Sequence, residues 1–206
     1  MIAGHHAMLA PSGLPSGWRL LEYVESTGAQ FVDTGIAPSA NALDYEIAFS
    51  HAAASIKGGF GCRQTSSAYT TGSYVVFLRS NSGSEARIDI VNNGAARYIV
   101  AAARTMHTFR YVAAERTLYA DGIAYTANSK TVCEYNFLLG GINTAGTAAA
   151  GAPIKIYSAS FYQSGVRVRD YLPVLDAAGE AGLWDAVTRF AFYSSTSTPL
   201  VAGPEL

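Results

Sequence analysis

Charged residues are scarce in this 206-residue sequence, at 14% of the total, and 14 basic residues nearly balance 15 acidic ones. Neither sign forms a run, so the sequence lacks the charged surface with which proteins bind nucleic acids or anionic lipids. It also lacks any apolar stretch that approaches the ~20 residues needed to span a bilayer. We therefore expect neither nucleic acid nor a membrane as a partner.

Cysteine is equally scarce, since Cys62 and Cys133 are the only two. Two cysteines cannot build the disulfide framework of a small secreted domain, and their separation does not fit the CxxC spacing of zinc or redox sites. Two unpaired thiols, buried or half-buried, are the simpler interpretation. A bridge stays open as an alternative, because it requires only that the two Cα atoms lie within about 7 Å.

The first residues have no hydrophobic period. Residues 1–17 contain glycine, proline, serine and two adjacent histidines, which is typical of a flexible arm or of an arm that docks on a partner. They also lack the basic and apolar regions of a secretory signal.

The rest of the chain has the composition of a folded domain. Half of all residues in the sequence are hydrophobic, so residues 18–206 can bury a sizeable core. We expect residues 18–206 to form a single domain.

Short runs rich in Tyr, Val, Ile, Phe and Thr recur between turn residues, which predicts an all-β fold. In Asp44–Ser50 the apolar residues Tyr45, Ile47 and Phe49 share one face, and Ser50 lies on the other with the acidic residues. This alternation predicts a strand with one exposed face. Tyr74–Leu78 is apolar on both faces, which favours the middle of a sheet.

Two further segments connect strands. Thr117–Thr126 places Asp121 and Gly122 between two alternating arms, and Asp-Gly favours the type I′ turn of a two-residue hairpin. Ala145–Ala152 is a short stretch of low complexity between two strands, and we interpret it as a surface loop.

Two segments near the ends carry a family resemblance. Leu21–Gly35 reads LEYVESTGAQFVDTG, and Lys155–Asp185 reads KIYSASFYQSGVRVRDYLPVLDAAGEAGLWD. Together they resemble the laminin G-like branch of the concanavalin A-like lectin and glucanase superfamily, especially the single-domain forms of phage, prophage and gut-bacterial proteins. The resemblance implies a two-sheet antiparallel β-sandwich, or jelly roll, whose N-terminal ribbon lies beside its C-terminal strand. In the second segment Arg167 and Arg169 are expected on one strand face, with Asp170 pairing with an arginine.

Glycosidases of this superfamily place two or three carboxylates on one strand, because alternate residues point the same way and flank one glycosidic bond at ~5 Å. Here the nearest candidates are Glu85 and Asp89, with Arg87 between them on the same face. An arginine at that position keeps both carboxylates ionised, which is unsuitable for a general acid. The four histidines accompany no GxSxG motif. We therefore expect no enzyme.

The segment from Arg63 to Arg79 is the candidate ligand site. It joins a polar loop that contains Tyr69 to a strand that carries Tyr74 and Arg79, and sugar sites combine aromatic platforms with planar hydrogen-bonding groups. An ordinary polar hairpin loop is the competing interpretation. The family resemblance allows one calcium ion, but the chain offers no recognisable ligand set.

Only Asp33 and Asp121 are positions to inspect for calcium, and Asp121 already has a role in its turn. The resemblance implies a non-catalytic recognition or adhesion module on a virion or an extracellular surface, which binds a cell-surface glycan or protein. The alternative is a structural decoration domain that docks other virion subunits through its N-terminal arm, without sugar. A glycoside hydrolase has the least support.

Overall fold

The computed structural model of the chain describes residues 13–38, 43–51, 57–65, 73–81, 85–92, 95–101, 104–126 and 133–206, and for residues 57, 73–81, 85–92, 95–101 and 150 it describes the backbone. Residues 1–12 of the expected arm lie outside it, so the arm stays a prediction. In this part of the chain no helix has the length and hydropathy needed to cross a membrane.

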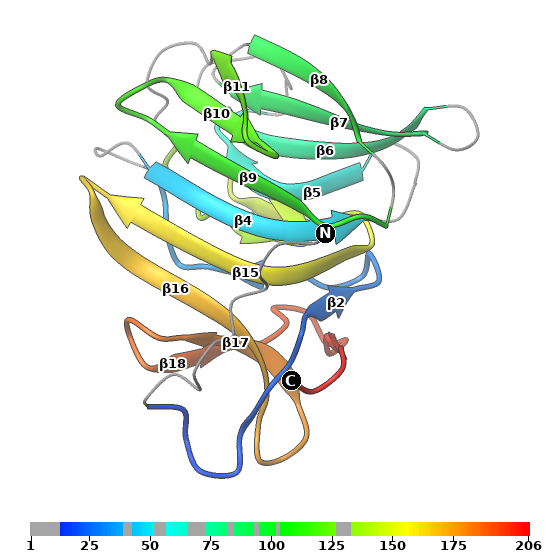
Figure 1. Cartoon of the computed structure of the whole chain (residues 1–206), viewed down its shortest axis with the longest axis vertical. Coiled ribbons are helices and arrows are strands. Elements are labelled where there is room, and N and C mark those ends of the chain that lie inside the picture. The colour runs from blue at the N-terminus through cyan, green and yellow to red at the C-terminus, as the bar shows by residue number, and fades with distance from the viewer. Residues whose placement is uncertain are drawn as a thin grey trace.

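Two β-sheets make up the fold (Figure 1). The larger sheet has the spatial order β11 (Ile123–Thr126), β10 (Thr117–Ala120), β9 (His107–Val112), β4 (Leu43–His51), β15 (Ile154–Gln163), β16 (Val166–Leu175), β17 (Ala181–Asp185), β18 (Phe190–Phe192). Three short strands attach to it: β1 (Arg19–Leu20), β2 (Val24–Ser26) and β19 (Val201–Ala202).

The second sheet has the order β14 (Thr147–Ala150), β13 (Gly141–Thr144), β5 (Lys57–Arg63), β6 (Ser73–Asn81), β7 (Glu85–Asn92), β8 (Ala95–Ala101), with β12 (Leu138–Leu139) and β3 (Val32–Asp33) beside it. Pairing is antiparallel except for a short parallel contact between β5 and β13. The prediction of an all-β fold with two antiparallel sheets is confirmed. β6, the strand that contains Tyr74–Leu78, lies between β5 and β7, inside its sheet as expected.

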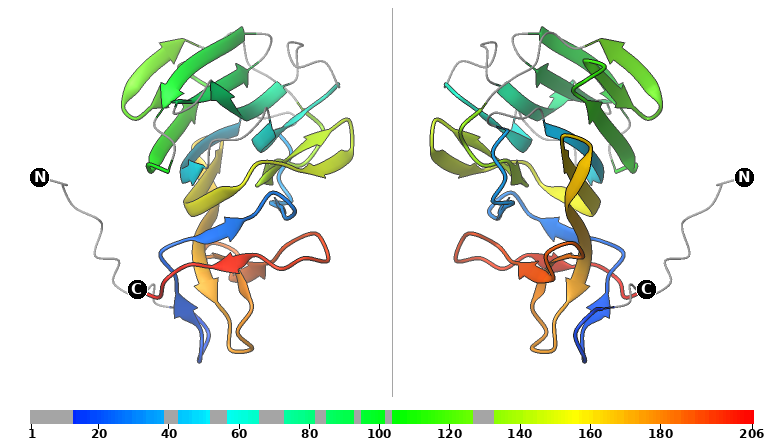
Figure 2. Two further views of the ribbon diagram at one scale, coloured as in Figure 1. Left: turned by 90° about the vertical axis from the view of Figure 1, so that its right-hand side faces the viewer. Right: turned by 90° about the vertical axis from the view of Figure 1, so that its left-hand side faces the viewer.

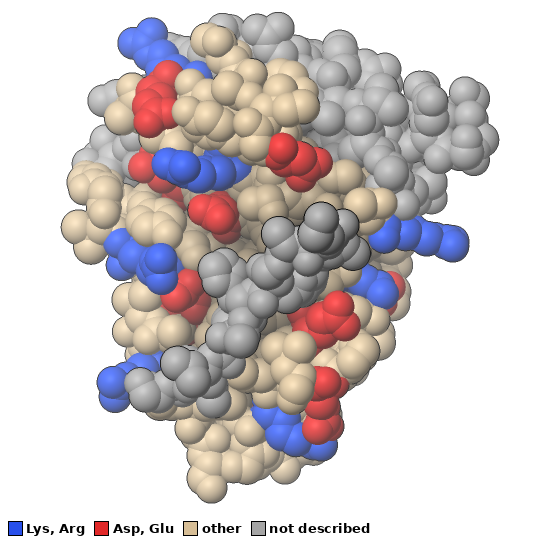
Figure 3. Space-filling model, in the orientation of Figure 1, with Lys and Arg blue, Asp and Glu red and all other residues tan. Residues whose placement is uncertain are grey.

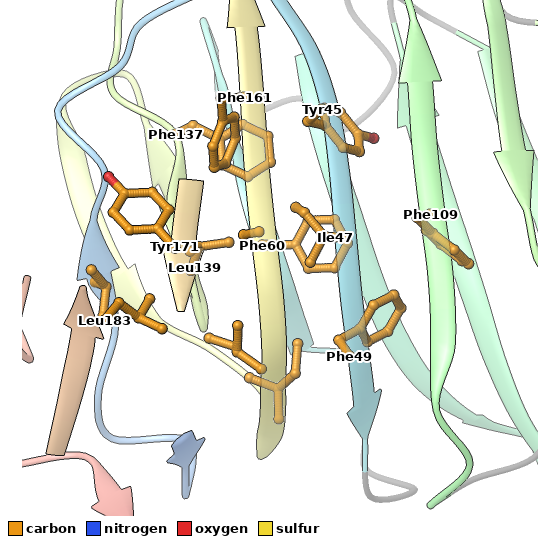
Figure 4. Close-up of a cluster of buried hydrophobic side chains, with 14 of the residues drawn as sticks. Tyr45, Ile47, Phe49, Phe60, Phe109, Phe137, Leu139, Phe161, Tyr171 and Leu183 are labelled. Atoms are coloured by element: carbon orange, nitrogen blue, oxygen red, sulfur yellow. The ribbon is translucent and has the colours of Figure 1, made fainter. Parts of the chain in front are cut away.

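Aromatic side chains fill the space between the sheets (Figure 4). Phe49 of β4 lies with its ring centroid 5.0 Å from that of Phe109 and 5.1 Å from that of Phe60, which comes from the second sheet. Tyr45, Ile47 and Phe49 are each at most 4% exposed, so the predicted alternation in β4 is confirmed. Removing one of these rings would cost about 3–5 kcal/mol.

The two end segments meet, as the resemblance implied. β1 pairs with β16, and β2 pairs with both β15 and β19, so strands from both ends of the chain lie side by side (Figure 2). The Trp18 ring packs edge-on against Trp184, with centroids 5.4 Å apart. The ends of the described chain are therefore joined by both backbone pairing and aromatic packing.

Two turns share one geometry, of which only the first was predicted. Asp121 and Gly122 have φ of 50° and 82° between β10 and β11, which confirms the Asp-Gly hairpin. Ala145 and Gly146 have φ of 51° and 85° and join β13 to β14. The interpretation of Ala145–Ala152 as a surface loop was therefore wrong for Thr147–Ala150, which form strand β14 of this hairpin.

The expectation that Arg167 and Arg169 share one strand face was wrong, because β16 contains a bulge. The register between β15 and β16 shifts between Phe161 and Tyr162, so that Arg169 lies opposite Phe161 and Arg167 opposite Tyr162. Arg167 and Arg169 therefore use different faces, because the extra residue reverses the alternation. The expected pairing of Asp170 holds, since Arg167 Nη1 lies 2.8 Å from Asp170 Oδ2.

Candidate ligand-binding face

The outer face of the larger sheet carries a row of polar side chains across five neighbouring strands. In register order these are Tyr119, Arg110, Glu46, Ser160 and Asp170. Residues that lie opposite each other in a sheet share a face, and Tyr45 and Phe161, which point into the core, alternate with members of this row. Figure 3 shows acidic and basic side chains next to one another over β9, β4 and β15.

One end of this face has a hollow of about 280 Å³, the Tyr162 hollow, which is lined by Asp44, Tyr45, Glu46, Arg110, Tyr111, Val112, Tyr162 and Gly165. The Tyr162 hydroxyl accepts a 3.0 Å hydrogen bond from Arg167, whose guanidinium also lies 5.3 Å from the ring centroid. Tyr162 and then Asp170 raise the pKa of Arg167. The other arginine here, Arg110, lies 5.5 Å from the Tyr119 ring. Both arginines are thus engaged by the chain's own groups.

The opposite end has a second hollow of about 300 Å³, the Tyr157 hollow, which is lined by Glu25, Ser50, His51, Arg104, Pro153, Ile154, Lys155 and Tyr157. A bulge in β15 creates it. The register with β4 shifts between Ile156 and Ser158, so Tyr157 is the extra residue and its side chain joins those of Lys155 and Ser158 on the outer face.

The aromatic residues of this hollow are held in place by polar contacts. The rings of Tyr23 and Tyr157 pack edge-on at 5.6 Å, and the Lys155 ammonium lies 4.0 Å from the Tyr23 ring centroid. A hydrogen bond with the Tyr23 hydroxyl raises the pKa of Lys155. The hydroxyls of Ser50 and Tyr157 lie 3.3 Å apart. Ser50 was expected to be exposed but is only 3% exposed, since it is closed in beneath Tyr157.

The charged groups at the rim of the Tyr157 hollow differ in their contacts with the rest of the chain. Arg104 sits in a turn with φ of 63°, where its backbone N–H donates to the His51 carbonyl at 2.8 Å. Within the described residues the Arg104 guanidinium has no hydrogen-bond or ion-pair partner, whereas the Glu25 carboxylate lies opposite Lys155 in register and, after Tyr23, contributes to raising the pKa of that lysine. With Lys155 the hollow therefore offers two cations and one anion around an aromatic residue.

Small side chains separate the two hollows. Thr108, Ala48 and Ser158 lie opposite one another on β9, β4 and β15, between the row that contains Glu46 and the row that contains Ser50. At the usual strand rise the distance from Glu46 to Ser50 is ~13 Å. An elongated ligand therefore meets no bulky side chain between the hollows on these three strands.

The predicted site residues lie on the second sheet or outside the described residues. Arg63, on β5, donates from Nε to the Thr144 hydroxyl at 2.8 Å, and burial lowers its pKa. Tyr74 and Arg79 lie on β6 and pair in register with Cys62 and Arg87. Tyr69 lies outside the described residues. Arg63 thus has a structural partner, and the ligand-binding role of all four residues stays a prediction.

The two aspartates named for calcium are engaged by other parts of the chain. Asp33 accepts hydrogen bonds from the Gly35 backbone and from Asn136, at 2.9 and 3.3 Å. Asp121 accepts from the Thr108 backbone and contacts His107 Nδ1, both at 2.8 Å. Across the described part of the chain, no three His, Cys, Asp or Glu side chains are grouped as metal ligands.

No family model matches the sequence, and no curated protein matches it. Among solved structures, the chain is similar to the CBM40 of Ruminococcus gnavus IT-sialidase, with 15% identity and a TM-score of 0.40 over 66% of this chain and 89% of that one. The same CBM40 bound to α2,3-sialyllactose gives 14% identity, a TM-score of 0.39 and the same coverage. A leech intramolecular trans-sialidase gives 17% identity and a TM-score of 0.32 over 66% of this chain and 26% of its own. Because these scores are low, we assign neither fold nor ligand from them.

Proposed function

We propose that this chain is a non-catalytic recognition module that binds carbohydrate on the outer face of its larger sheet. The observation that carries the proposal is the Tyr157 hollow. It combines an aromatic ring with a hydroxyl, an ammonium, a guanidinium and a carboxylate from separate strands and a turn. A sugar needs this combination, because it presents an apolar ring face and a rim of hydroxyl groups.

Hydrolysis has less support than binding. A glycosidase requires two carboxyl groups on opposite sides of one glycosidic bond, at about 5 Å or about 6.5–9.5 Å. Among the residues that line the Tyr157 hollow, Glu25 supplies the single carboxylate. In the Tyr162 hollow, Asp44 accepts a 2.8 Å hydrogen bond from the Ala113 backbone, which leaves Glu46 without an available partner acid among the lining residues.

We extend the proposal to a member of the laminin G-like branch that acts on a virion or an extracellular surface. The support for this is the resemblance of Leu21–Gly35 and Lys155–Asp185, together with the pairing of those segments. The biological ligand on this view is a glycan of the cell surface to which the particle or protein attaches.

The test is titration of the purified chain with neutral and acidic oligosaccharides, sialyllactose included, followed by calorimetry of those that bind. We expect saturable binding to at least one of them, with chemical-shift or fluorescence changes at Tyr157 and none at Tyr162. The absence of binding to every oligosaccharide and to intact bacterial cells would overturn the proposal. Release of reducing ends by the chain would contradict its non-catalytic part.

A structural assembly role has one observation in its favour. Phe190 is 69% exposed at the start of β18, the short edge strand of the larger sheet, and Val187 is 45% exposed in the turn that leads into that strand. Exposed apolar residues on a sheet edge favour contact with another protein. Sedimentation of the native chain and of Phe190→Ser tests this role. A concentration-dependent oligomer that the substitution abolishes supports it, and a monomer in both cases contradicts it for self-association.

A further inference from the structure

The only two cysteines of the sequence come together in the core. Cys62 and Cys133 are both fully buried in the same core cluster, and the Glu134 N–H donates a 3.1 Å hydrogen bond to the Gln64 side chain, which holds the two cysteine-bearing segments together. The backbone fixes both positions. Cys62 lies on β5, between its pairings with β6 and β13, and the Cys133 N–H donates to the Pro38 carbonyl at 2.8 Å. Two buried thiols whose chain segments are fixed side by side need little backbone movement to bond.

The two thiols differ in acidity. The hydrogen bond from the Cys62 thiol lowers the pKa of Cys133, whose sulfur also accepts from the Tyr135 backbone N–H. Burial, and then the contact with Cys133, raises the pKa of Cys62 well above its usual range. A thiolate is the attacking species in thiol–disulfide exchange. Cys133 is therefore suited to attack first, and Cys62 to follow.

A small polar contact lies between this pair and solvent. The Glu134 backbone N–H donates to the Gln64 side chain at 3.1 Å, and Gln64 Nε2 donates back to the Glu134 carboxylate at 3.4 Å. Gln64 and Glu134 follow the two cysteines closely along the chain. Because these hydrogen bonds are exposed, opening them costs little. Cys133 is next to Glu134 in the chain, so opening this contact loosens the edge of the core at which Cys133 is buried.

We propose that Cys62 and Cys133 form a reversible intrachain disulfide by exchange with a small-molecule disulfide of the glutathione class. The Cys133 thiolate attacks one sulfur of oxidised glutathione, which releases one glutathione thiolate and leaves a mixed disulfide on Cys133. Cys62 then loses its proton, and its sulfur attacks the Cys133 sulfur and displaces the second glutathione. The chain loses two hydrogens, and one oxidised glutathione becomes two reduced molecules, which take up both protons.

The bridge would connect β5 to the segment that leads into β12, and it would enclose β6 to β11. Closing a loop of about 70 residues restricts the unfolded chain strongly, which stabilises the folded state. Because the segments that carry the two thiols are already joined by the contact between Gln64 and Glu134, the accompanying strain is expected to be small. The bridged chain is thus expected to unfold at a higher temperature than the dithiol.

The experiment incubates the full, reduced chain in glutathione buffers of graded ratio, blocks remaining thiols by alkylation at low pH and measures intact mass. We expect a monomer that loses two hydrogens and takes up no alkyl group, a single linked peptide pair under non-reducing digestion, and a rise in melting temperature that reductant reverses. A native chain that keeps two alkylatable thiols in oxidised glutathione overturns the proposal. Oxidation that yields only linked dimers overturns it equally.

Single substitutions separate the roles of the two thiols. Cys62→Ala is expected to accumulate a glutathione adduct on Cys133, because the second step cannot occur. Cys133→Ala is expected to leave Cys62 unmodified under the same conditions, and the reverse pattern contradicts the assigned order of attack. Gln64→Ala keeps both thiols and is expected to accelerate bridge formation without changing its extent. If an alanine variant does not fold, the mass of the native chain still decides whether the bridge forms.

Discussion

The two hollows on the outer face of the larger sheet contain similar residue types but use them differently. In the Tyr162 hollow, the ring lies beneath Arg167, which is also paired with Asp170. In the Tyr157 hollow, the structure describes no cation over the Tyr157 ring, and the Arg104 guanidinium lacks a partner among the described residues. The first set of polar groups stabilises the β15–β16 hairpin. In the second hollow, the face of the Tyr157 ring and the Arg104 guanidinium are available to a ligand.

The two hollows should therefore differ in ligand affinity, because separating polar groups that are bonded to each other costs free energy. A ligand that binds at Tyr162 has to displace charge-assisted contacts that the fold already makes, whereas a ligand at Tyr157 can bind the Arg104 guanidinium without displacing a partner among the described residues. Similar size is therefore a poor guide to function, since the hollows measure about 280 and 300 Å³. The hollows differ in whether their ring and their guanidinium groups already contact other groups of the chain.

The largest expected effect separates the two tyrosines. Tyr157→Ala removes the aromatic platform and is expected to weaken binding of the best oligosaccharide by at least about tenfold, which corresponds to ~1.4 kcal/mol. Tyr162→Ala is the matched control and is expected to change affinity by less than about twofold. Calorimetric titration of both variants checks this. Equal losses in the two variants would remove the distinction between the hollows.

A smaller effect is expected from the unpaired guanidinium. Arg104→Ala should weaken binding about fivefold, because one exposed charge-assisted hydrogen bond is lost. Arg116→Ala is a suitable control, since Arg116 is also exposed and also has a left-handed backbone, with φ of 51° against 63° for Arg104. Both variants therefore carry the same backbone cost. An affinity that falls equally in both would show that the turn conformation, and not the charge, is responsible.

The third expected effect is on stability and not on binding. Arg167→Ala removes contacts to Tyr162 and Asp170, and the two charged side chains are 49% and 26% exposed. Such a pair contributes about 0.5–1 kcal/mol to folding. Urea unfolding should show this loss, with oligosaccharide affinity unchanged. A marked loss of affinity in this variant would assign the ligand to the Tyr162 hollow instead.

Local pattern predicted the frame of this molecule but not its candidate site. The alternation of Tyr45, Ile47 and Phe49 and the Asp121-Gly122 turn are properties of a few consecutive residues, and both are confirmed. The alternation in a strand also indicates which face a residue uses, but it says nothing about register with other strands. For this reason the pairing of the end segments required a family resemblance.

The Tyr157 hollow escaped prediction because it depends on register and on a bulge. Glu25, Ser50 and Lys155 meet only because β2 and β4 flank β15 at that point, and Arg104 arrives from the turn before β9. The bulge at Tyr157 alters the alternation in a way that no local signal marks. The prediction of a loop over Ala145–Ala152 was wrong at Thr147–Ala150 for a related reason. The low-complexity sequence gives no sign of the hairpin turn at Ala145 and Gly146, which only the backbone geometry shows.

The smallest expected effect is the response of the Tyr157 hollow to pH. Because the Tyr23 hydroxyl raises the pKa of Lys155 above the usual ~10.4, this ammonium stays charged to a higher pH than an ordinary lysine. Affinity should therefore vary by less than about twofold between about pH 7.5 and 9.5. Tyr23→Phe removes the hydroxyl, so the alkaline loss of affinity should begin at a lower pH than in the native chain. An identical onset in both proteins would contradict this role of the Tyr23 hydroxyl.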